Sequence, residues 1–107
     1  MKLFLIVLLL TISLSINAQN VLPIVSSGKL VRIENFQSKY VTQRNIDIWF
    51  PNGYDGKKKF AVLYMHDGQA LYDSTTTWNH QAWDVEDVTE TLLAKGKLKN
   101  FIVAGIW

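Results

Sequence analysis

The sequence predicts an α/β fold in which an antiparallel pair of strands precedes a strand–helix–strand unit of a mostly parallel sheet. Residues 60–65 and 101–107 are short apolar runs, as expected of strands buried on both faces. Residues 84–95 between them repeat apolar side chains at helical spacing. Residues 30–36 and 44–50 instead alternate between apolar and polar side chains, which is typical of half-exposed strands.

The first two strands are expected to pair with each other, because they are amphipathic and close in sequence. In the second strand, alternation divides the side chains between two faces. One face carries Ile46, Ile48 and Phe50, and the other carries Asn45, Asp47 and Trp49. We expect Trp49, on the polar side, to cover the sheet rather than to bind ligand. The third strand, residues 60–65, does not alternate and should lie deeper in the sheet.

The helix is expected over residues 84–95 because both ends carry suitable signals. Asp84 is a candidate N-cap, and Gly96 can take the left-handed conformation that follows a helix. The apolar positions form a stripe that should pack onto the sheet. They are Val85, Val88, Leu92 and Leu93.

The N-terminus has the features of a secretory signal peptide. Lys2 precedes an apolar run over residues 3–10, and Ala18 supplies a small residue for cleavage. The run is too short for a typical membrane span, although a retained anchor helix is the alternative. The expected organisation is a signal peptide at 1–18, a leader arm at 19–28 and the N-terminal portion of a folded domain at 29–107. The product would be exported, periplasmic or extracellular, with no membrane attachment after cleavage. The chain has no Cys, so disulfides and lipidation at an N-terminal Cys are excluded.

Charge and size restrict the function further. Eleven Lys and Arg oppose nine Asp and Glu, so no strong field attracts nucleic acid or a membrane surface. A single predicted helix cannot cover both faces of a parallel sheet. Either partners supply the cover or this is the front part of a longer protein, and we favour the second.

The segment His66-Asp67-Gly68-Gln69 follows the third strand and is the main candidate site. Ligands of parallel sheets bind at the carboxyl ends of the strands. Gly68 would let the backbone bend away from the strand, and the amide exposed after the bend would belong to Gln69. Such an N–H can stabilise the oxyanion that forms when an acyl carbonyl is attacked.

This strand end, extended through residues 70–73 and followed by Trp78-Asn79 and the acidic helix, resembles the esterase family that includes enterochelin esterase, S-formylglutathione hydrolase, feruloyl esterase and mycolyltransferase relatives. The resemblance covers roughly residues 30–107. It implies an α/β-hydrolase fold, a Ser-Asp/Glu-His triad and ester hydrolysis without a cofactor. It also implies that Gln69 donates an oxyanion-hole N–H, that Gly68 permits the turn, and that His66 and Asp67 shape the loop.

The family pattern is incomplete here. The sequence contains no Gly-x-Ser-x-Gly, so the nucleophile and its triad partners cannot be assigned and we expect no activity from this polypeptide. The substrate expected of the parent is a small-molecule ester, on a carbohydrate or a siderophore, bound by Trp78 with His66 and Asp67.

Other interpretations of these residues stay open. His66 could act as a base, although a structural histidine is favoured. His66, Asp67, His80 and Asp84 could form a metal site, which is disfavoured because the loop between them is unconstrained. The alternative function is an exported, non-catalytic carbohydrate-binding module that uses Trp49, Trp78 and Trp83.

Overall fold

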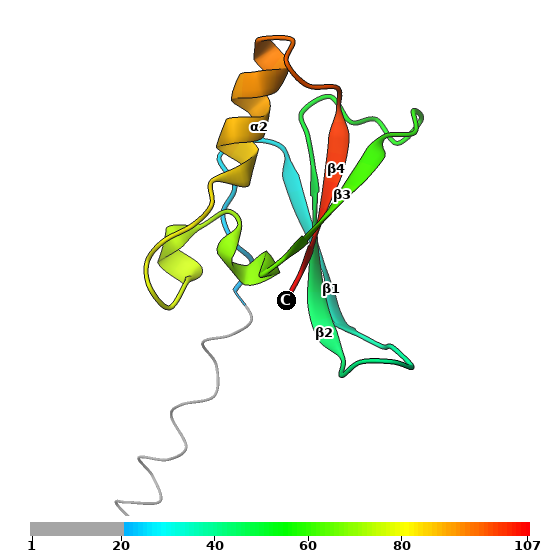
Figure 1. Cartoon of the computed structure of the whole chain (residues 1–107), viewed down its shortest axis with the longest axis vertical. Coiled ribbons are helices and arrows are strands. Elements are labelled where there is room, and N and C mark those ends of the chain that lie inside the picture. Colours follow the sequence, from blue (N-terminus) through cyan, green and yellow to red (C-terminus); the bar gives the residue numbers. More distant parts are fainter. Residues whose placement is uncertain (1–20) are drawn as a thin grey trace, which may run out of the picture.

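The computed structural model describes residues 21–107, which form one mixed four-stranded sheet with a helix and short turns beside it (Figure 1). The elements in chain order are β1 (Lys29–Phe36), β2 (Arg44–Phe50), β3 (Ala61–His66), the 3-10 turns η1 (Gly68–Ala70) and η2 (Ser74–Thr76), α2 (Val85–Ala94) and β4 (Phe101–Ile106). The expected signal peptide, residues 1–18, lies outside the described residues, as does the start of the arm. Within residues 21–107 no helix has the length and apolar character needed to cross a bilayer.

The sheet has the order β1-β2-β4-β3. β1 pairs with β2 and β2 with β4 in antiparallel fashion, whereas β3 pairs with β4 in parallel. The antiparallel pair and the parallel strand–helix–strand unit are therefore confirmed. The expected depth of β3 was wrong, because β3 is the edge strand and its central residues Val62, Leu63 and Tyr64 are exposed. The chain returns through α2 to place β4, not β3, between two neighbours.

The covered face of the sheet is the one that carries Asp47 and Trp49. Both side chains are 0% exposed, whereas Ile46 and Ile48 on the opposite face are half-buried. The face that alternation marked as polar is thus the interior one. The reason is that Asp47 has a buried cationic partner, Arg32, which lies opposite it on β1. A paired carboxylate can occupy an interior position.

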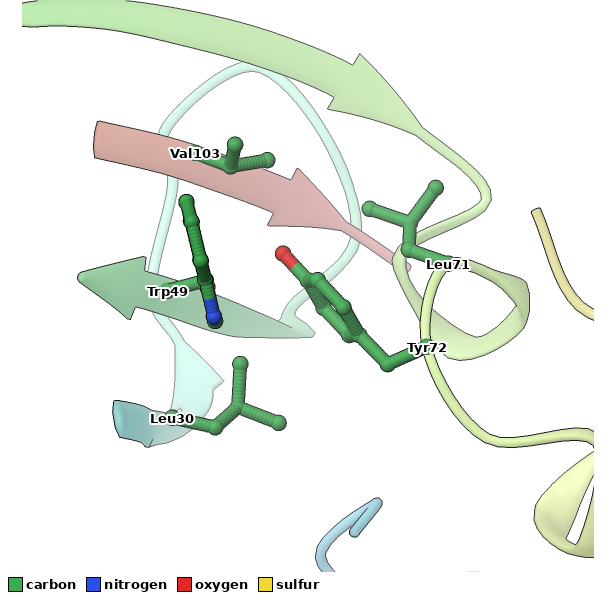
Figure 2. Close-up of a cluster of buried hydrophobic side chains, with 5 residues drawn as sticks. All are labelled: Leu30, Trp49, Leu71, Tyr72 and Val103. Atoms are coloured by element: carbon green, nitrogen blue, oxygen red, sulfur yellow. The ribbon is translucent and has the colours of Figure 1, made fainter. Parts of the chain in front are cut away.

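The core lies between this face and the segment that follows η1. Trp49, Val103 and Leu30 come from three adjacent strands, and Leu71 and Tyr72 come from the loop. Figure 2 shows the Tyr72 ring between Trp49 and Leu71, with its hydroxyl directed into the cluster. Because the core takes two residues from this loop, the loop is fixed against the carboxyl ends of β3 and β4.

Helix α2 ends as predicted but buries a different side. Gly96 is left-handed, and Gly96 N–H and Lys97 N–H donate to the carbonyls of Leu93 and Leu92, which is a Schellman motif. Asp84 holds the N-cap position without a side-chain capping bond. The side chains buried most deeply are Glu86 and Thr89.

The apolar stripe expected on α2 packs only in part. Val85 contacts the core and Leu92 and Leu93 are half-buried, but Val88 is 54% exposed. The rotation follows from the leader arm, whose Ser26 donates its backbone N–H to the Glu86 carboxylate. This bond holds the polar side of the first turn against the protein.

Candidate active-site cleft

The turn after β3 differs from the expected one in the residue that bends. Asp67, not Gly68, has the left-handed backbone (φ 56°), and the Ala70 N–H donates to the Asp67 carbonyl at 2.8 Å. Asp is one of the few residues that tolerate this conformation. The predicted conformational role of Gly68 was therefore wrong.

Gly68 is instead required by a close approach between two backbones. A Cβ at Gly68 would lie 2.6 Å from the Gly105 carbonyl carbon and 3.0 Å from the Ile106 nitrogen. A Cβ at Gly105 would in turn lie 3.1 Å from the Gly68 Cα. The turn thus rests directly on β4, with no side chain between them.

This contact places the Gln69 backbone N–H in the first turn of η1. The first amides of a helix have no partner within the helix. Among residues 21–107, no backbone acceptor in another element or loop receives a hydrogen bond from this N–H. Gln69 also lines a cleft at this edge of the sheet.

The cleft has a volume of about 1230 Å³ and is formed by four segments. These are the arm near Val21 and Pro23, the η1 turn, the loop over residues 75–83 and the end of β4 at Trp107. Trp78 and Trp83 are 93% and 69% exposed, so their rings are free to contact a ligand. Asp67 is the single charged residue among the described lining residues. The lining therefore favours a neutral ligand with a flat, apolar part.

The buried ion pair between Arg32 and Asp47 holds the Trp107 side chain in place. The Arg32 guanidinium binds both oxygens of Asp47 at 2.7 and 2.8 Å. The Trp107 indole N–H donates to Asp47 at 3.0 Å, and the Arg32 guanidinium carbon lies 4.5 Å from the Trp107 ring centroid. Bidentate pairing and ring stacking both need the planar guanidinium. The ion pair consequently sets the orientation of one cleft wall.

The arm is held against the same region by acidic side chains. Asp73 accepts from Ile24 N–H and also from Thr75, while Glu86 and Asp87 accept from Ser26. The hydroxyl bond from Thr75, followed by the backbone bonds, lowers the pKa of Asp73 below its usual value.

Two buried groups beside the core have raised pKa values. Burial raises the pKa of Tyr72, and the charges of Glu86 and Asp47 raise it further. Burial is also the main cause that raises the pKa of Glu86, and the Ser26 N–H partly offsets it. Tyr72 Oη and Glu86 Oε2 have no hydrogen-bond partner within the described part of the chain. The interior behind the cleft is therefore polar and incompletely paired.

The structure brings some of the candidate residues together and separates others. Asp67, Gln69 and Trp78 line the cleft, whereas Gly68 is buried behind it. His66, the last residue of β3, is exposed and is not among the lining residues.

The structure does not assemble the candidate metal site, and it removes one of the three tryptophans from the carbohydrate interpretation. Within residues 21–107 no three or more His, Cys, Asp or Glu side chains gather closely enough to hold a metal ion. The quartet formed by His66, Asp67, His80 and Asp84 is therefore not assembled. Trp49 is 0% exposed, so it cannot offer a stacking surface to a sugar, and the expectation that it covers the sheet is confirmed.

Several residues of this region were missed from the sequence. Arg32 lies on β1, Asp47 lies on β2, Trp107 follows β4, and Asp73 lies in the loop before η2. Asp47 and Arg32 occupy polar positions of two alternating strands, and a charged pair on neighbouring strands is a signal that could have identified them. Asp73 had a weaker signal, the Asp-x-Thr pattern of a side-chain-capped turn.

No family model matches the chain. Solved structures of ferulic acid esterases share its fold. A CE1 ferulic acid esterase from Anaeromyces mucronatus, in complex with ferulic acid, gives a TM-score of 0.53 at 21% identity over 83% of this chain and 32% of that chain. The same enzyme without substrate gives 0.54 at 24% identity, with the same coverage. A mutant of the feruloyl esterase module from Clostridium thermocellum, complexed with sinapinate, gives 0.52 at 21% identity over 78% of this chain and 28% of that one.

These likenesses show the fold. The chain spans less than a third of the length of these neighbours, so its mixed sheet corresponds to a part of an esterase fold.

Proposed function

We propose that this chain is the N-terminal part of an exported serine esterase of the α/β-hydrolase fold. The observation that carries the proposal is the Gln69 N–H. It has no backbone partner outside its own turn, and its residue lines the cleft that follows the carboxyl end of the parallel strand β3. Solved ferulic acid esterases share the surrounding fold.

In the complete enzyme, Gln69 would contribute one of two oxyanion-hole donors. A serine hydroxyl attacks the ester carbonyl, and the carbonyl oxygen becomes an anion in the tetrahedral intermediate. The Gln69 N–H would bind this oxygen, together with the N–H of the residue that follows the serine. Because the Gly68–Gly105 contact holds the turn in place, the donor needs no reorganisation during the reaction. These 107 residues contain no Gly-x-Ser-x-Gly motif, which would carry the serine.

The cleft favours an ester with a neutral, flat acyl group. Trp78, Trp83 and Trp107 offer aromatic surface, and Asp67 would disfavour an anionic ligand. One neighbouring structure holds ferulic acid, whose aromatic ring has the shape this lining accepts. We infer that the parent enzyme hydrolyses esters of aromatic acids, including esters carried on a carbohydrate. A siderophore ester remains the second substrate class.

The proposal is tested first on this polypeptide and then on its reading frame. The chain should show no turnover of p-nitrophenyl acetate above background, and robust turnover would contradict the missing triad. The reading frame beyond codon 107 should encode Gly-x-Ser-x-Gly within a few dozen residues. A stop codon there would favour a complete, non-catalytic protein. Export is checked by the mass of the secreted product, which should begin at Gln19.

The role of Gln69 is tested in the longer protein. Gln69→Pro removes the N–H and should lower kcat roughly 100- to 1000-fold. Gln69→Ala keeps the N–H and is the matched control, with kcat close to that of the wild type. Equal losses in both variants would show that the side chain, and not the amide, is what matters.

A further inference from the structure

Asp73 joins two segments that form separate walls of the cleft. The leader arm, residues 21–28, contributes Val21 and Pro23 to the lining. The loop after η1 contributes three threonines from positions 75–77 and Trp78. Asp73 contacts both segments although it is 49 residues from Ile24 in sequence.

Each carboxylate oxygen of Asp73 serves a different segment. Oδ2 accepts from the Ile24 N–H at 2.9 Å. Oδ1 accepts from the Thr75 N–H at 2.9 Å and from the Thr75 hydroxyl at 2.6 Å. The backbone carbonyl of Asp73 also accepts from the Thr76 N–H and hydroxyl. One residue therefore satisfies donors from both walls.

This arrangement needs an aspartate. The turn that begins η2 requires a single acceptor, which Ser, Thr or Asn could supply. The arm adds a donor on the other side, and only a carboxylate presents two acceptor oxygens at this side-chain length. Asp73 is also buried, at 8% exposure, so its carboxylate depends on these donors in place of water.

We propose that Asp73 is a positioning residue that sets the width of the cleft by holding the leader arm and the loop with the threonines at 75–77 together. The ligand part of this inference rests on the proposed function, whereas the holding of the two walls does not. Loss of the carboxylate should let the walls move apart without unfolding the sheet. The cleft would then bind an ester of an aromatic acid more weakly.

The test compares Asp73→Asn with Asp55→Asn in the full chain. Asp55 caps a surface turn by accepting from the Lys57 and Lys58 N–H groups, far from the cleft lining, so it is a matched control. Asparagine offers one acceptor oxygen where Asp73 uses two. In Asp73→Asn, the Ile24 or the Thr75 amide should therefore exchange hydrogen at least about tenfold faster. The amides of the helix end at Gly96 and Lys97 should keep their wild-type exchange rates.

Ligand binding gives the second readout. Methyl ferulate, titrated by tryptophan fluorescence, should bind several-fold more weakly to Asp73→Asn and unchanged to Asp55→Asn. Unchanged exchange at both Ile24 and Thr75 in Asp73→Asn would overturn the proposal. If Asp73→Asn speeds hydrogen exchange at Ile24 or Thr75 but the wild type does not bind methyl ferulate, the positioning role of Asp73 stands and the proposed function loses its support.

A milder variant keeps the proposal testable if Asp73→Asn does not fold. Thr75→Val removes the Thr75 hydroxyl donor and keeps the Ile24 and Thr75 backbone N–H groups that donate to the Asp73 carboxylate. Methyl ferulate affinity should fall while the Ile24 amide stays protected. An affinity equal to that of the wild type would overturn the part of the proposal that concerns the loop.

Discussion

Gly68 and Gly105 meet because the turn after β3 crosses the end of the neighbouring strand at backbone distance. Asp67 supplies the left-handed bend, so the absent side chain of Gly68 has one purpose, which is to permit the contact. The position of the Gln69 amide depends on this contact. A steric effect and a conformational effect can be separated here by comparing glycines.

Gly68→Ala should destabilise the protein more than Gly53→Ala. The added methyl at Gly68 meets backbone atoms 2.6 and 2.7 Å away, which cannot rotate aside, and overpacking of this kind costs about 1–3 kcal/mol or more. At Gly53 (φ +80°) nothing lies within 4 Å, so only left-handed strain of about 1–2 kcal/mol is expected. Urea unfolding followed by tryptophan fluorescence measures both values. A larger loss at Gly53 would show that the backbone contact is relaxed in solution.

Asp47→Asn should cost about 3–5 kcal/mol, because it leaves the Arg32 guanidinium buried without a counter-charge. The side chains of the pair are 6% and 0% exposed, so water cannot compensate. Removing both charges, with Arg32→Met and Asp47→Leu, should cost less than the sum of the two single changes. A double-mutant cycle in urea measures the coupling. Additive losses would mean that the two charges do not stabilise each other.

At the scale of elements, the sequence predicted the strands and the helix but assigned two buried faces wrongly. Residues 44–50 alternate clearly, and alternation predicts a strand without showing which face is interior. Asp47 looked like a surface residue because its partner Arg32 lies on another strand. On α2, the apolar stripe was visible but the arm that reorients the first turn was not. Local patterns could not reveal the contact between the arm and α2, nor the edge position of β3.

The buried carboxylate of α2 should make stability depend on pH. Burial raises the folded-state pKa of Glu86 above the value of about 4.3 in an unfolded chain. The folded protein therefore binds the Glu86 proton more tightly than the unfolded chain does. Protonation of Glu86 thus stabilises the fold fully below about pH 4.3, and this stabilisation is lost as the pH rises through the folded-state pKa. Glu86→Gln should remove that decline while it keeps an acceptor for the Ser26 N–H.

Thermal unfolding from pH 4 to 8 measures this dependence. Glu86→Gln should be at least as stable as the wild type at pH 7. Glu34→Gln makes the same change at an exposed position of β1 and should leave the pH profile as it is. If the stability of the wild type relative to Glu86→Gln rose with pH through the same window, the Glu86 contribution would have the opposite sign.

At the scale of the molecule, one face of the sheet is covered and the other is largely open. The loop and η1 cover the side that carries Trp49, and Figure 1 shows α2 and the turns on one side of the strands. On the other side, Val31 and Ile33 are 38% and 40% exposed, and Tyr64 on the edge strand is 71% exposed. Sheets with parallel pairs are normally covered on both faces. The open face is the side that the rest of the larger domain proposed above would cover.

The open face and the unprotected edge should make this polypeptide self-associate. Within residues 21–107, β3 pairs only with β4, so its outer edge presents free backbone donors and acceptors and carries no Lys or Pro. Tyr64→Lys places a charge on this strand and should shift the sedimentation-equilibrium distribution towards monomer. Tyr40→Lys makes the same change at a 92% exposed position between β1 and β2 and should not. Equal effects would assign association to net charge, and a monomeric wild type at all concentrations would show that neither the face nor the edge is adhesive.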